Sequence, residues 1–123
     1  MVDVRKFVGG KGEETAKEFL LKKGYRWVAS NFRTRGGEID LIMLDGNALV
    51  FVEVKRRRSW EYGRPEEAVT PVKVRHMTKT ALLYLKANGI RDKMVRFDVV
   101  SVDDDGVRHY ADAFQVDAGS YYF

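Results

Sequence analysis

The stretch ALVFVEVK, residues 48–55, determines how the rest of the chain is arranged. Its first five residues are all apolar, which is typical of a central strand covered on both faces of a sheet. Glu53 and Lys55 then interrupt the apolar pattern. Because alternate residues of a strand project from the same face, these two side chains are neighbours, while Val54 points to the other face. An acid and an amine side by side in a buried strand need a chemical explanation.

A second strand is predicted just before this one, at residues 38–44. The sequence Asp45-Gly46-Asn47 separates the two strands and indicates a hairpin turn, so the strands are predicted to be antiparallel neighbours. A two-residue loop would set Asp40 opposite Phe51, and a four-residue loop would set it opposite Glu53, with the charged groups on one face in both cases. A three-residue loop without a bulge would put Asp40 on the other face. The sequence leaves these alternatives open.

Residues 11–23 are predicted to form the first helix, with Gly24 at its stop position. At about 100° per residue, Glu13 falls near Leu20 on the apolar stripe of this helix, while Glu14 points nearly away from it. Glu13 can therefore face the sheet.

A second helix is predicted from Thr70-Pro71 to Asn88, with Gly89 as its stop, because Thr is a good N-cap and Pro suits the first helical turn. The segment before it, residues 56–63, has no clear period and is predicted to be a mobile loop. The buried stripe of the helix is predicted to contain Val74, Met77, Ala81, Tyr84 and Leu85.

Three further strands complete the expected elements. Residues 25–29 precede the hairpin, residues 94–102 form another apolar strand, and residues 107–110 form a last one after an acidic turn at residues 103–106. Helices and strands therefore follow one another in an α/β pattern.

Composition limits the class of protein. A chain of 123 residues with 45% hydrophobic and 12% aromatic residues can build one packed core, so we expect a single domain over residues 1–123. The absence of cysteine excludes a disulfide framework and a thiolate zinc site, and two histidines are too few for a histidine cluster. The longest apolar run, residues 48–52, is too short to span a bilayer, and the N-terminus lacks the apolar stretch of a signal peptide. We expect a cytoplasmic protein without a membrane partner.

Charge is unevenly distributed along the chain. The formal net charge is +4, but residues 98–123 carry six Asp and one Arg, which leaves residues 1–97 with a net charge of +9. A local surplus of Lys and Arg indicates a polyanionic partner, since phosphates gain from Coulomb attraction and from counterion release. The same surplus also serves ordinary solubility, so charge alone leaves both interpretations open.

Carboxylates in this pattern predict a metal site. Glu13, Asp40 and Glu53 would repel one another without a cation, and oxygen ligands suit Mg²⁺ or Mn²⁺ better than zinc. Such a metal polarises a phosphodiester and lowers the pKa of a bound water, while Lys55 orients that water or stabilises the developing charge. Glu38 shares a face with Asp40 and is either a supporting acid or an arginine partner. The alternative is a cross-strand ion pair on a solvated face, which contributes little stability.

Short motifs along nearly the whole chain resemble a known family. They are Gly12-Glu13 with Ala16, Asn31-Phe32-Arg33, Gly37-Glu38-Ile39-Asp40-Leu41-Ile42, Val50-Phe51-Val52-Glu53-Val54-Lys55-Arg56, Gly63 with Glu67-Ala68-Val69, Lys73, and Arg96-Phe97-Asp98-Val99-Val100. In these motifs and their order the chain resembles the bacterial YraN family of predicted endonucleases. That family is similar to archaeal Holliday-junction resolvases and belongs to the restriction-endonuclease-like superfamily of PD-(D/E)xK nucleases.

The resemblance implies an α/β fold in which helices flank a mixed central sheet, together with divalent-metal-dependent cleavage of phosphodiesters. Carried over by position, Asp40, Glu53 and Lys55 correspond to the core motif of the superfamily, and Glu13 corresponds to its helix-borne acid. The Pro that precedes the Asp in the superfamily is replaced here by Ile39.

Basic residues close to this core are candidates for nucleic-acid contacts. Arg56, Arg57 and Arg58 directly follow the predicted central strand, and Lys73 belongs to the first part of the second helix. We expect these side chains to contact phosphates. The alternatives are a solvated charge run for the arginines and an ordinary surface position for the lysine.

The remaining candidates are aromatic or isolated residues. Trp60 and Tyr62 are predicted either to stack on bases or to pack within the protein or against a second subunit. Asp98 lies in a strand and is predicted to be a structural hydrogen-bond acceptor. His76 and His109 are isolated in the sequence, so we assign them no catalytic role.

The leading hypothesis is a Mg²⁺- or Mn²⁺-dependent endonuclease that acts on DNA, with branched or irregular DNA as its substrate because the sequence shows no obvious base-reading element. A homodimer would suit paired cuts. One alternative is a non-catalytic nucleic-acid-binding module on a nuclease fold, and another is an α/β protein that binds an acidic protein partner. Intact carboxylates favour the enzyme, because they would repel phosphate in a protein that only binds it.

Overall fold

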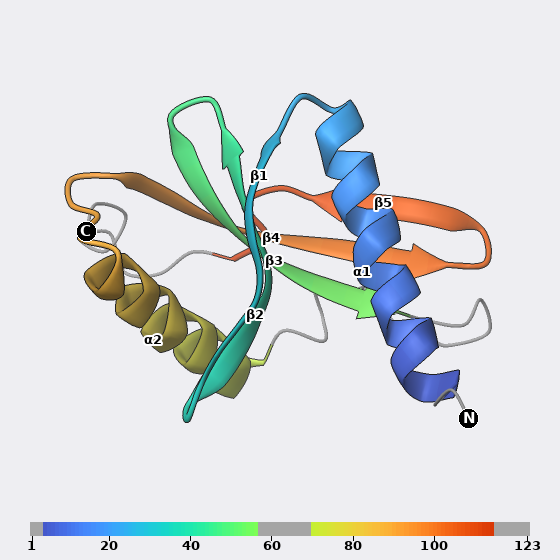
Figure 1. Cartoon of the computed structure of the whole chain (residues 1–123), viewed down its shortest axis with the longest axis horizontal. Helices are drawn as coiled ribbons and strands as arrows, with labels where there is room; N and C mark the ends of the chain where they lie inside the picture. Colours follow the sequence, from blue (N-terminus) through green and yellow to red (C-terminus); the bar gives the residue numbers. More distant parts are fainter. Residues whose placement is uncertain (1–3, 57–69, 115–123) are drawn as a thin grey trace.

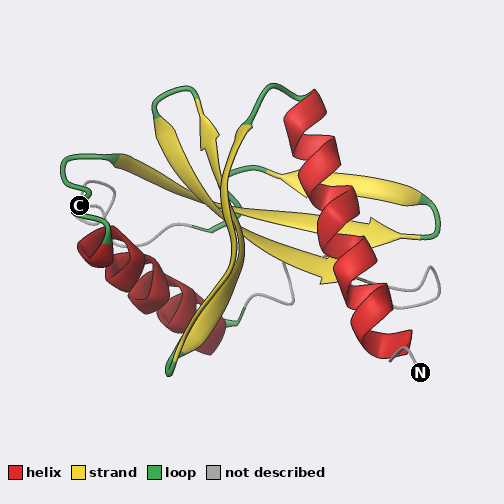
Figure 2. Cartoon of the chain, in the orientation of Figure 1, coloured by secondary structure: helices red, strands yellow, loops and turns green. Residues whose placement is uncertain are grey.

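The computed structural model describes residues 4–56 and 70–114, with side chains from residue 12 onward. Helices and strands account for most of these residues (Figure 1, Figure 2). In chain order they are α1 (Val4–Lys22), β1 (Arg26–Thr34), β2 (Gly37–Asp45), β3 (Ala48–Arg56), α2 (Pro71–Ala87), β4 (Met94–Asp103) and β5 (Gly106–Tyr110). The α/β pattern expected from the sequence is confirmed. Neither described helix is long and apolar enough to cross a membrane.

The strands form one mixed sheet in the order β1-β2-β3-β4-β5. Neighbouring strands are antiparallel except β3 and β4, which are parallel. A parallel pair requires a crossover connection, and α2 lies in the segment that joins these two strands. The central position predicted for residues 48–55 is therefore confirmed, because β3 is the middle strand of the five.

Each face of the sheet is covered by one helix, and the two helices lie on opposite sides in Figure 1. On one face, Leu49 and Phe51 pack with α2 residues such as Met77 and Tyr84. On the other face, Val50 and Val52 pack with Ala16 and Leu20 of α1; these two groups define the core. Alternate residues of β3 therefore contact different helices, which explains why this strand is apolar almost throughout.

The first helix ends as predicted but begins earlier. Gly24 has φ 99°, a left-handed conformation that glycine adopts at low energetic cost, and the Tyr25 N–H donates to the Leu20 carbonyl across the helix end. The predicted start at residue 11 was wrong, since α1 begins at Val4. The helix runs through Gly9 and Gly10, whose low helix propensity favours a later start when only local preferences are considered.

The second helix has the predicted ends. The Thr70 hydroxyl accepts a hydrogen bond from the Lys73 N–H at 3.2 Å, Pro71 opens the first turn, and Gly89 follows the helix with φ 63°. One position of the predicted stripe was wrong, because Val74 is half-buried and Thr80 is buried instead. Thr80 tolerates burial because its hydroxyl donates to the His76 carbonyl at 2.7 Å.

The hairpin between β2 and β3 has a two-residue loop, but its register differs from the one predicted for such a loop. Asp45 pairs with Ala48, so Gly46 and Asn47 form the loop, and Ile42 rather than Asp40 lies opposite Phe51. Gly46 has φ 56° at the first central position, where a type II′ turn requires a positive φ. The sequence had left the loop length open, and the pairing of Ile42 with Phe51 continues to the register that was expected for a four-residue loop, in which Asp40 lies opposite Glu53.

The strand before this hairpin is longer than predicted. β1 extends from Arg26 to Thr34 instead of ending at residue 29, because its polar second half pairs with β2 from Ser30–Leu41 to Thr34–Gly37. The last two strands have the predicted positions to within one residue.

Candidate metal centre

The register of the central hairpin places two of the predicted acids on one face. Ile42 of β2 is paired with Phe51 of β3, and both pack on the α2 side. Asp40 and Glu53 each lie two residues from one member of this pair. Because opposed residues share a face and side chains alternate along a strand, Asp40 and Glu53 project from that face together, and Lys55 follows on the same side. The same-face arrangement required by the sequence hypothesis is present.

Carboxylates from two elements converge beside this face. Oxygen atoms of Glu13, Glu38 and Asp40 all lie within 4.8 Å of one another, and among the described residues this is the one acidic group that could share a single ion. Glu13 comes from α1, and the other two acids come from β2. Glu38 also accepts a hydrogen bond from Arg33 at 3.0 Å, so both roles considered for Glu38 are compatible with its position.

Glu13 faces the sheet as the helical wheel predicted. Its side chain is half-buried, whereas Glu14 is exposed. Burial raises the pKa of Glu13, and a hydrogen bond with the Asn31 side chain partly opposes that rise. Asn31 has φ 55°, a left-handed conformation that Asn tolerates better than most residues. Asn31 could not be recognised as a partner of Glu13 from the sequence, because nothing local to β1 indicates that its side chain meets a carboxylate of α1.

Asp40 is the most strongly perturbed acid of the group. Burial and the negative charges of Glu53, Glu13 and Glu38 raise the pKa of Asp40 to about 7, against an ordinary value of 3.8. The Val54 N–H donates to Asp40 Oδ2 at 2.8 Å and opposes this rise, because it favours the charged form. Asp40 is thus held in place by β3 while its neighbours disfavour its ionisation.

Glu53 has a cationic partner from the second helix. Its side chain is 8% exposed, and one carboxylate oxygen accepts a hydrogen bond from the Lys73 ammonium. Burial by itself lowers the pKa of Lys73, but the hydrogen bond and charge of Glu53 outweigh it, so the pKa lies above its ordinary value. The negative charge of Asp40 also raises the pKa of Lys73.

Glu38, Asp40, Glu53 and Lys73 line one pocket of about 320 Å³ between β2, β3 and the start of α2, whereas Glu13 is not among its lining residues. The lining residues are Gly37, Glu38, Asp40, Glu53, Thr70, Val72, Lys73, His76 and Met77. Acids from the sheet form one wall, and the first turn of the helix with its lysine forms another. The pocket therefore combines anionic groups for a cation with a cationic group for an anion. His76 also lines this pocket, although no catalytic role had been expected for it.

The residues present fit a hard divalent cation. Glu13, Glu38 and Asp40 offer carboxylate oxygens within 4.8 Å of one another, and oxygen is the donor that Mg²⁺ and Mn²⁺ prefer. Burial, together with neighbouring acids, raises the pKa of Asp40 and of Glu13, and a cation bound among these carboxylates would favour their charged forms. Glu38 completes this donor group, whereas the sequence hypothesis had named Glu53 together with Glu13 and Asp40.

The basic residues predicted to bind phosphate are only partly described. Lys73 lies in the pocket, Lys55 is half-buried on β3, and Arg56 is the exposed last residue of that strand. Arg57 and Arg58 lie outside the described residues. So do Trp60, Tyr62, the rest of the predicted mobile loop and the motif residues 63–69.

A second charged cluster lies on the α1 face of the sheet, where Asp98 of β4 pairs with Val52 of β3, and it has a structural role. Asp98 is fully buried on β4 and accepts hydrogen bonds from Arg96, from His109 at 2.7 Å and from the backbone N–H of Asp112 at 2.9 Å. The Lys23 ammonium lies 2.9 Å from His109 Nδ1 and can only donate, so His109 donates from Nε2 to Asp98. The prediction that Asp98 is a structural acceptor fits these contacts, and His109 is its partner rather than an isolated residue.

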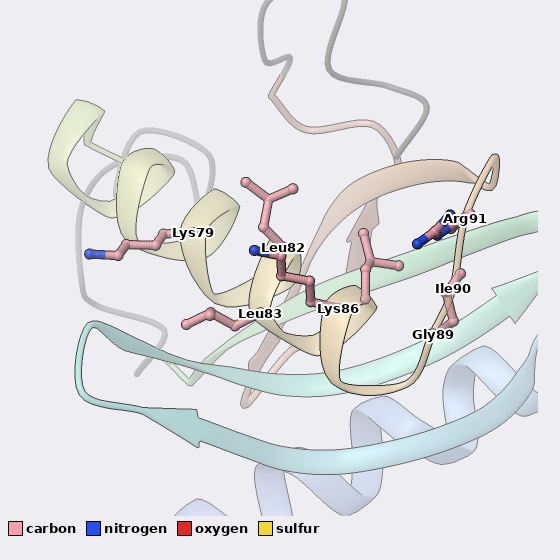
Figure 3. Close-up of a pocket in the computed structure, with 8 residues that line it drawn as sticks. Lys79, Leu82, Leu83, Lys86, Gly89, Ile90 and Arg91 are labelled. Atoms are coloured by element: carbon pink, nitrogen blue, oxygen red, sulfur yellow. The ribbon is translucent and has the colours of Figure 1, made fainter.

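A larger pocket of about 530 Å³ lies on the second half of α2 and is mostly apolar (Figure 3). Leu82 and Leu83 of the helix and Ile90 of the following loop line it, and Lys79 and Lys86 stand beside them. No carboxylate is among its lining residues. Of these two pockets, the smaller one is therefore the candidate for binding a cation through carboxylates.

Comparison with known proteins places the chain in one family. Residues 12–102 match the model of a family described as "Uncharacterised protein family UPF0102". A UPF0102 protein of Geobacter sulfurreducens is 43% identical over 116 residues, which cover 90% of this chain and 91% of that protein. A UPF0102 protein of Symbiobacterium thermophilum is 54% identical over 96 residues, which cover 78% of this chain and 81% of that protein.

The family match includes the elements that carry the candidate metal centre. Residues 12–102 contain Glu13, Glu38, Asp40, Glu53 and Lys73. Because the match covers most of the chain and the relatives align over most of their own length, membership of the YraN family, expected from the sequence motifs, is confirmed. The chain belongs to the UPF0102 (YraN) family.

Proposed function

We propose that this protein is a divalent-metal-dependent endonuclease that hydrolyses phosphodiester bonds of DNA. The observation that carries the proposal is the close approach of Glu13, Glu38 and Asp40, whose oxygens lie within 4.8 Å of one another beside the Glu53–Lys73 pair. Acids alone would repel a phosphate, and lysine alone would not bind a metal. Their combination in one pocket suits a substrate that is held through both a cation and its own negative charge.

The arrangement of elements supports a restriction-endonuclease-like fold. The mixed sheet has a helix on each face, as that fold requires, and the predicted Asp and Glu-x-Lys motif lies on the adjacent strands β2 and β3. In this proposal Asp40, Glu53 and Lys55 form the core motif, and Glu13 is the acid that the first helix supplies.

In this proposal the acidic residues of the pocket bind the cation, and the lysines bind the phosphate. Glu13, Glu38 and Asp40 would hold Mg²⁺ or Mn²⁺, with Glu53 as a further carboxylate in the pocket that Glu38 and Asp40 line. When bound, the cation supplies positive charge that polarises the phosphodiester and makes water a better nucleophile near neutral pH. Lys55 and Lys73 contribute ammonium groups that bind phosphate oxygens and stabilise charge that develops there.

The preferred partner in this proposal is branched or irregular DNA, bound through its phosphates by the basic residues near β3. Arg56 extends the cationic surface from the end of that strand, and Arg57 and Arg58 follow in the sequence. A cytoplasmic homodimer would place two pockets on one substrate and allow paired cuts.

The test is a cleavage assay on labelled duplex, single-stranded, flap and four-way-junction substrates, in DNA and in RNA. Reactions contain Mg²⁺, Mn²⁺ or EDTA and compare the wild type with Asp40→Asn and Glu53→Gln. Because removal of one group that stabilises charge lowers catalytic rates by about 10²–10³-fold, both variants are expected to cut at least 100-fold more slowly. Both should still bind the substrate, since the phosphate contacts remain.

Glu13→Gln and Glu14→Gln form a matched pair on one helix. We expect loss of cutting only for Glu13→Gln, because Glu14 is exposed and points away from the sheet. Binding without any metal-dependent cutting would favour the non-catalytic nucleic-acid-binding module. Cutting that survives both Asp40→Asn and Glu53→Gln would point to a contaminating nuclease and contradict the proposal.

A further inference from the structure

The ammonium group of Lys73 lies next to acidic side chains that could otherwise bind a metal cation. Its ammonium group contacts Glu53 directly, in the same pocket as Asp40 and Glu38. Glu53 is 8% exposed at its side chain, and a buried carboxylate requires a partner of opposite charge or a set of hydrogen-bond donors. Among its described contacts, Lys73 provides both charge and hydrogen bond.

Lys73 is also able to leave this position without a change of fold. Its side chain is 32% exposed, so one side of it already faces solvent. Its backbone is fixed separately, because the Lys73 N–H donates to the Thr70 hydroxyl at the start of α2. A flexible four-carbon side chain on a fixed backbone can move its ammonium group between two partners. Glu53, by contrast, is held within the central strand.

We infer that Lys73 is a displaceable counter-ion that couples the binding of a divalent cation to the binding of nucleic-acid phosphate. Without a divalent cation, Lys73 neutralises Glu53. A cation held by Glu13, Glu38 and Asp40 also attracts Glu53, whose charge acts on Asp40 in the same pocket, and so competes with Lys73 for that carboxylate. The released ammonium then contacts a phosphate of the substrate. This inference rests on the proposed function, since it takes the carboxylates as the cation site and nucleic acid as the anion.

The coupling follows from charge. Lys73 stabilises Glu53 when the pocket carries a surplus of acids, and that stabilisation is lost when a divalent cation supplies the positive charge instead. Phosphate binding offers the displaced ammonium a second anionic partner. Because linkage between two sites is reciprocal, the cation must strengthen nucleic-acid binding by the same factor by which nucleic acid strengthens cation binding.

The first measurement is the affinity for Mn²⁺ alone, followed by electron paramagnetic resonance, for the wild type, Lys73→Met and Lys79→Met. Lys79 is an exposed lysine of the same helix that lines the apolar pocket, so its substitution controls for a general loss of charge. Removal of the competing ammonium is expected to tighten Mn²⁺ binding at least fivefold in Lys73→Met, the lower end of typical coupling factors. Lys79→Met should resemble the wild type.

Lys73→Gln provides a second variant that keeps a hydrogen-bond donor near Glu53 but removes the charge. It should show the same direction of change as Lys73→Met, and circular dichroism would confirm that each variant is folded. Equal Mn²⁺ affinity in the wild type and in both neutral variants would overturn the inference and leave the metal site intact. Absence of Mn²⁺ binding in all of the proteins would overturn the proposed function together with the inference.

The second measurement is the affinity for a fluorescent four-way DNA junction in Ca²⁺ and in EDTA, with Ca²⁺ chosen as a divalent cation that binds carboxylates. We expect Ca²⁺ to tighten binding at least fivefold for the wild type and Lys79→Met, and this gain to disappear in Lys73→Met. An equal gain in Lys73→Met would contradict the coupling, even if that variant binds Mn²⁺ more tightly.

Discussion

The groups around Asp40 have opposite effects on its ionisation. The Val54 N–H binds its carboxylate at 2.8 Å, which favours the charged form, whereas burial and three neighbouring acids favour the neutral form. The balance raises the pKa of Asp40 to about 7. A side chain in this state is ionised at neutral pH only in part, and a divalent cation would ionise it fully.

Asp40→Asn is expected to stabilise the protein at pH 8 in EDTA. An acid whose pKa is raised on folding binds more protons in the folded state than in the unfolded state, so wild-type stability falls as pH rises from about 4 to about 7. Asn has no charge to repel the other acids, and its side-chain oxygen can still accept from Val54. The gain should be about 1–3 kcal/mol at pH 8 and should vanish near pH 4, as measured by urea unfolding.

Added Mg²⁺ is expected to reverse the difference in stability between the two proteins. It should stabilise the wild type at pH 8 much more than Asp40→Asn, because it binds the folded state through the ionised carboxylate. Asp104→Asn, at an exposed turn position, should show neither effect. A wild type more stable than Asp40→Asn at pH 8 in EDTA would show that the acids are not in mutual repulsion.

At the scale of elements, the close approach of β2 to α2 positions the acids. A methyl group added to Gly37 would lie 2.9 Å from the Thr80 hydroxyl and 3.4 Å from the His76 carbonyl oxygen. Both atoms belong to α2, so this glycine lets the strand pack directly on the helix. Glu38 and Asp40 follow Gly37 on the same strand, and the geometry of the pocket depends on this contact.

Gly37→Ala should therefore destabilise the protein by about 1–3 kcal/mol, the usual consequence of overpacking. It should also weaken Mn²⁺ binding, because a shift of β2 moves Glu38 and Asp40 away from Glu13. Gly36→Ala is the matched control, since a methyl group there meets only the flexible end of Lys79 at 3.8 Å. Chemical denaturation and Mn²⁺ titration of the two variants would test this; equal stability in both would contradict the steric argument.

At the scale of the whole molecule, the Asp98 cluster connects segments that are distant in sequence. Arg96 bonds Asp98, and it also reaches Asp45 at 2.8 Å and the Tyr25 hydroxyl. The cluster thus joins β4 to the end of β2 and to the start of β1, and His109 adds β5. Burial raises the pKa of Asp98, but the hydrogen bonds from His109 and Arg96 outweigh burial and hold this pKa below its ordinary value.

Asp98→Asn is expected to destabilise the protein by about 3–5 kcal/mol at pH 7, because Arg96 loses its buried anionic partner. An acid whose pKa is lowered on folding contributes stability above its unfolded pKa of about 3.9, and this contribution is lost as pH falls through the folded pKa. The difference between wild type and variant should therefore shrink below about pH 4. Unfolding measured at pH 7 and pH 3 would test both statements, and a difference independent of pH would contradict them.

Much of the fold could be predicted because its signals are local. The apolar run at residues 48–52 indicated a central strand, and Thr70, Pro71 and Gly89 marked the ends of α2 through capping and backbone preferences. The direction of Glu13 relative to Glu14 also follows from helical periodicity alone. Local preferences failed for the start of α1, since low helix propensity at its two glycines does not end the helix.

The composition of the acidic cluster depended on contacts between distant segments. The sequence predicted Asp40 and Glu53 on one face for two of the three loop lengths it left open, and the register that aligns them is set by the two-residue loop Gly46-Asn47. Glu38 joins Glu13 and Asp40 because α1 crosses beside β2, and Lys73 meets Glu53 because α2 packs on the opposite side.

The sequence by itself therefore determined most of the helices and strands, the central position of β3, and the set of acidic residues from which a metal site could be built. Periodicity, capping and turn preferences act within a few residues, so they can be recognised without the fold. Only the tertiary structure decided which acids share an ion, which lysine pairs with Glu53, and how Asp40 acquires its raised pKa. These outcomes depend on distance and burial, and both arise only when helices and strands pack together.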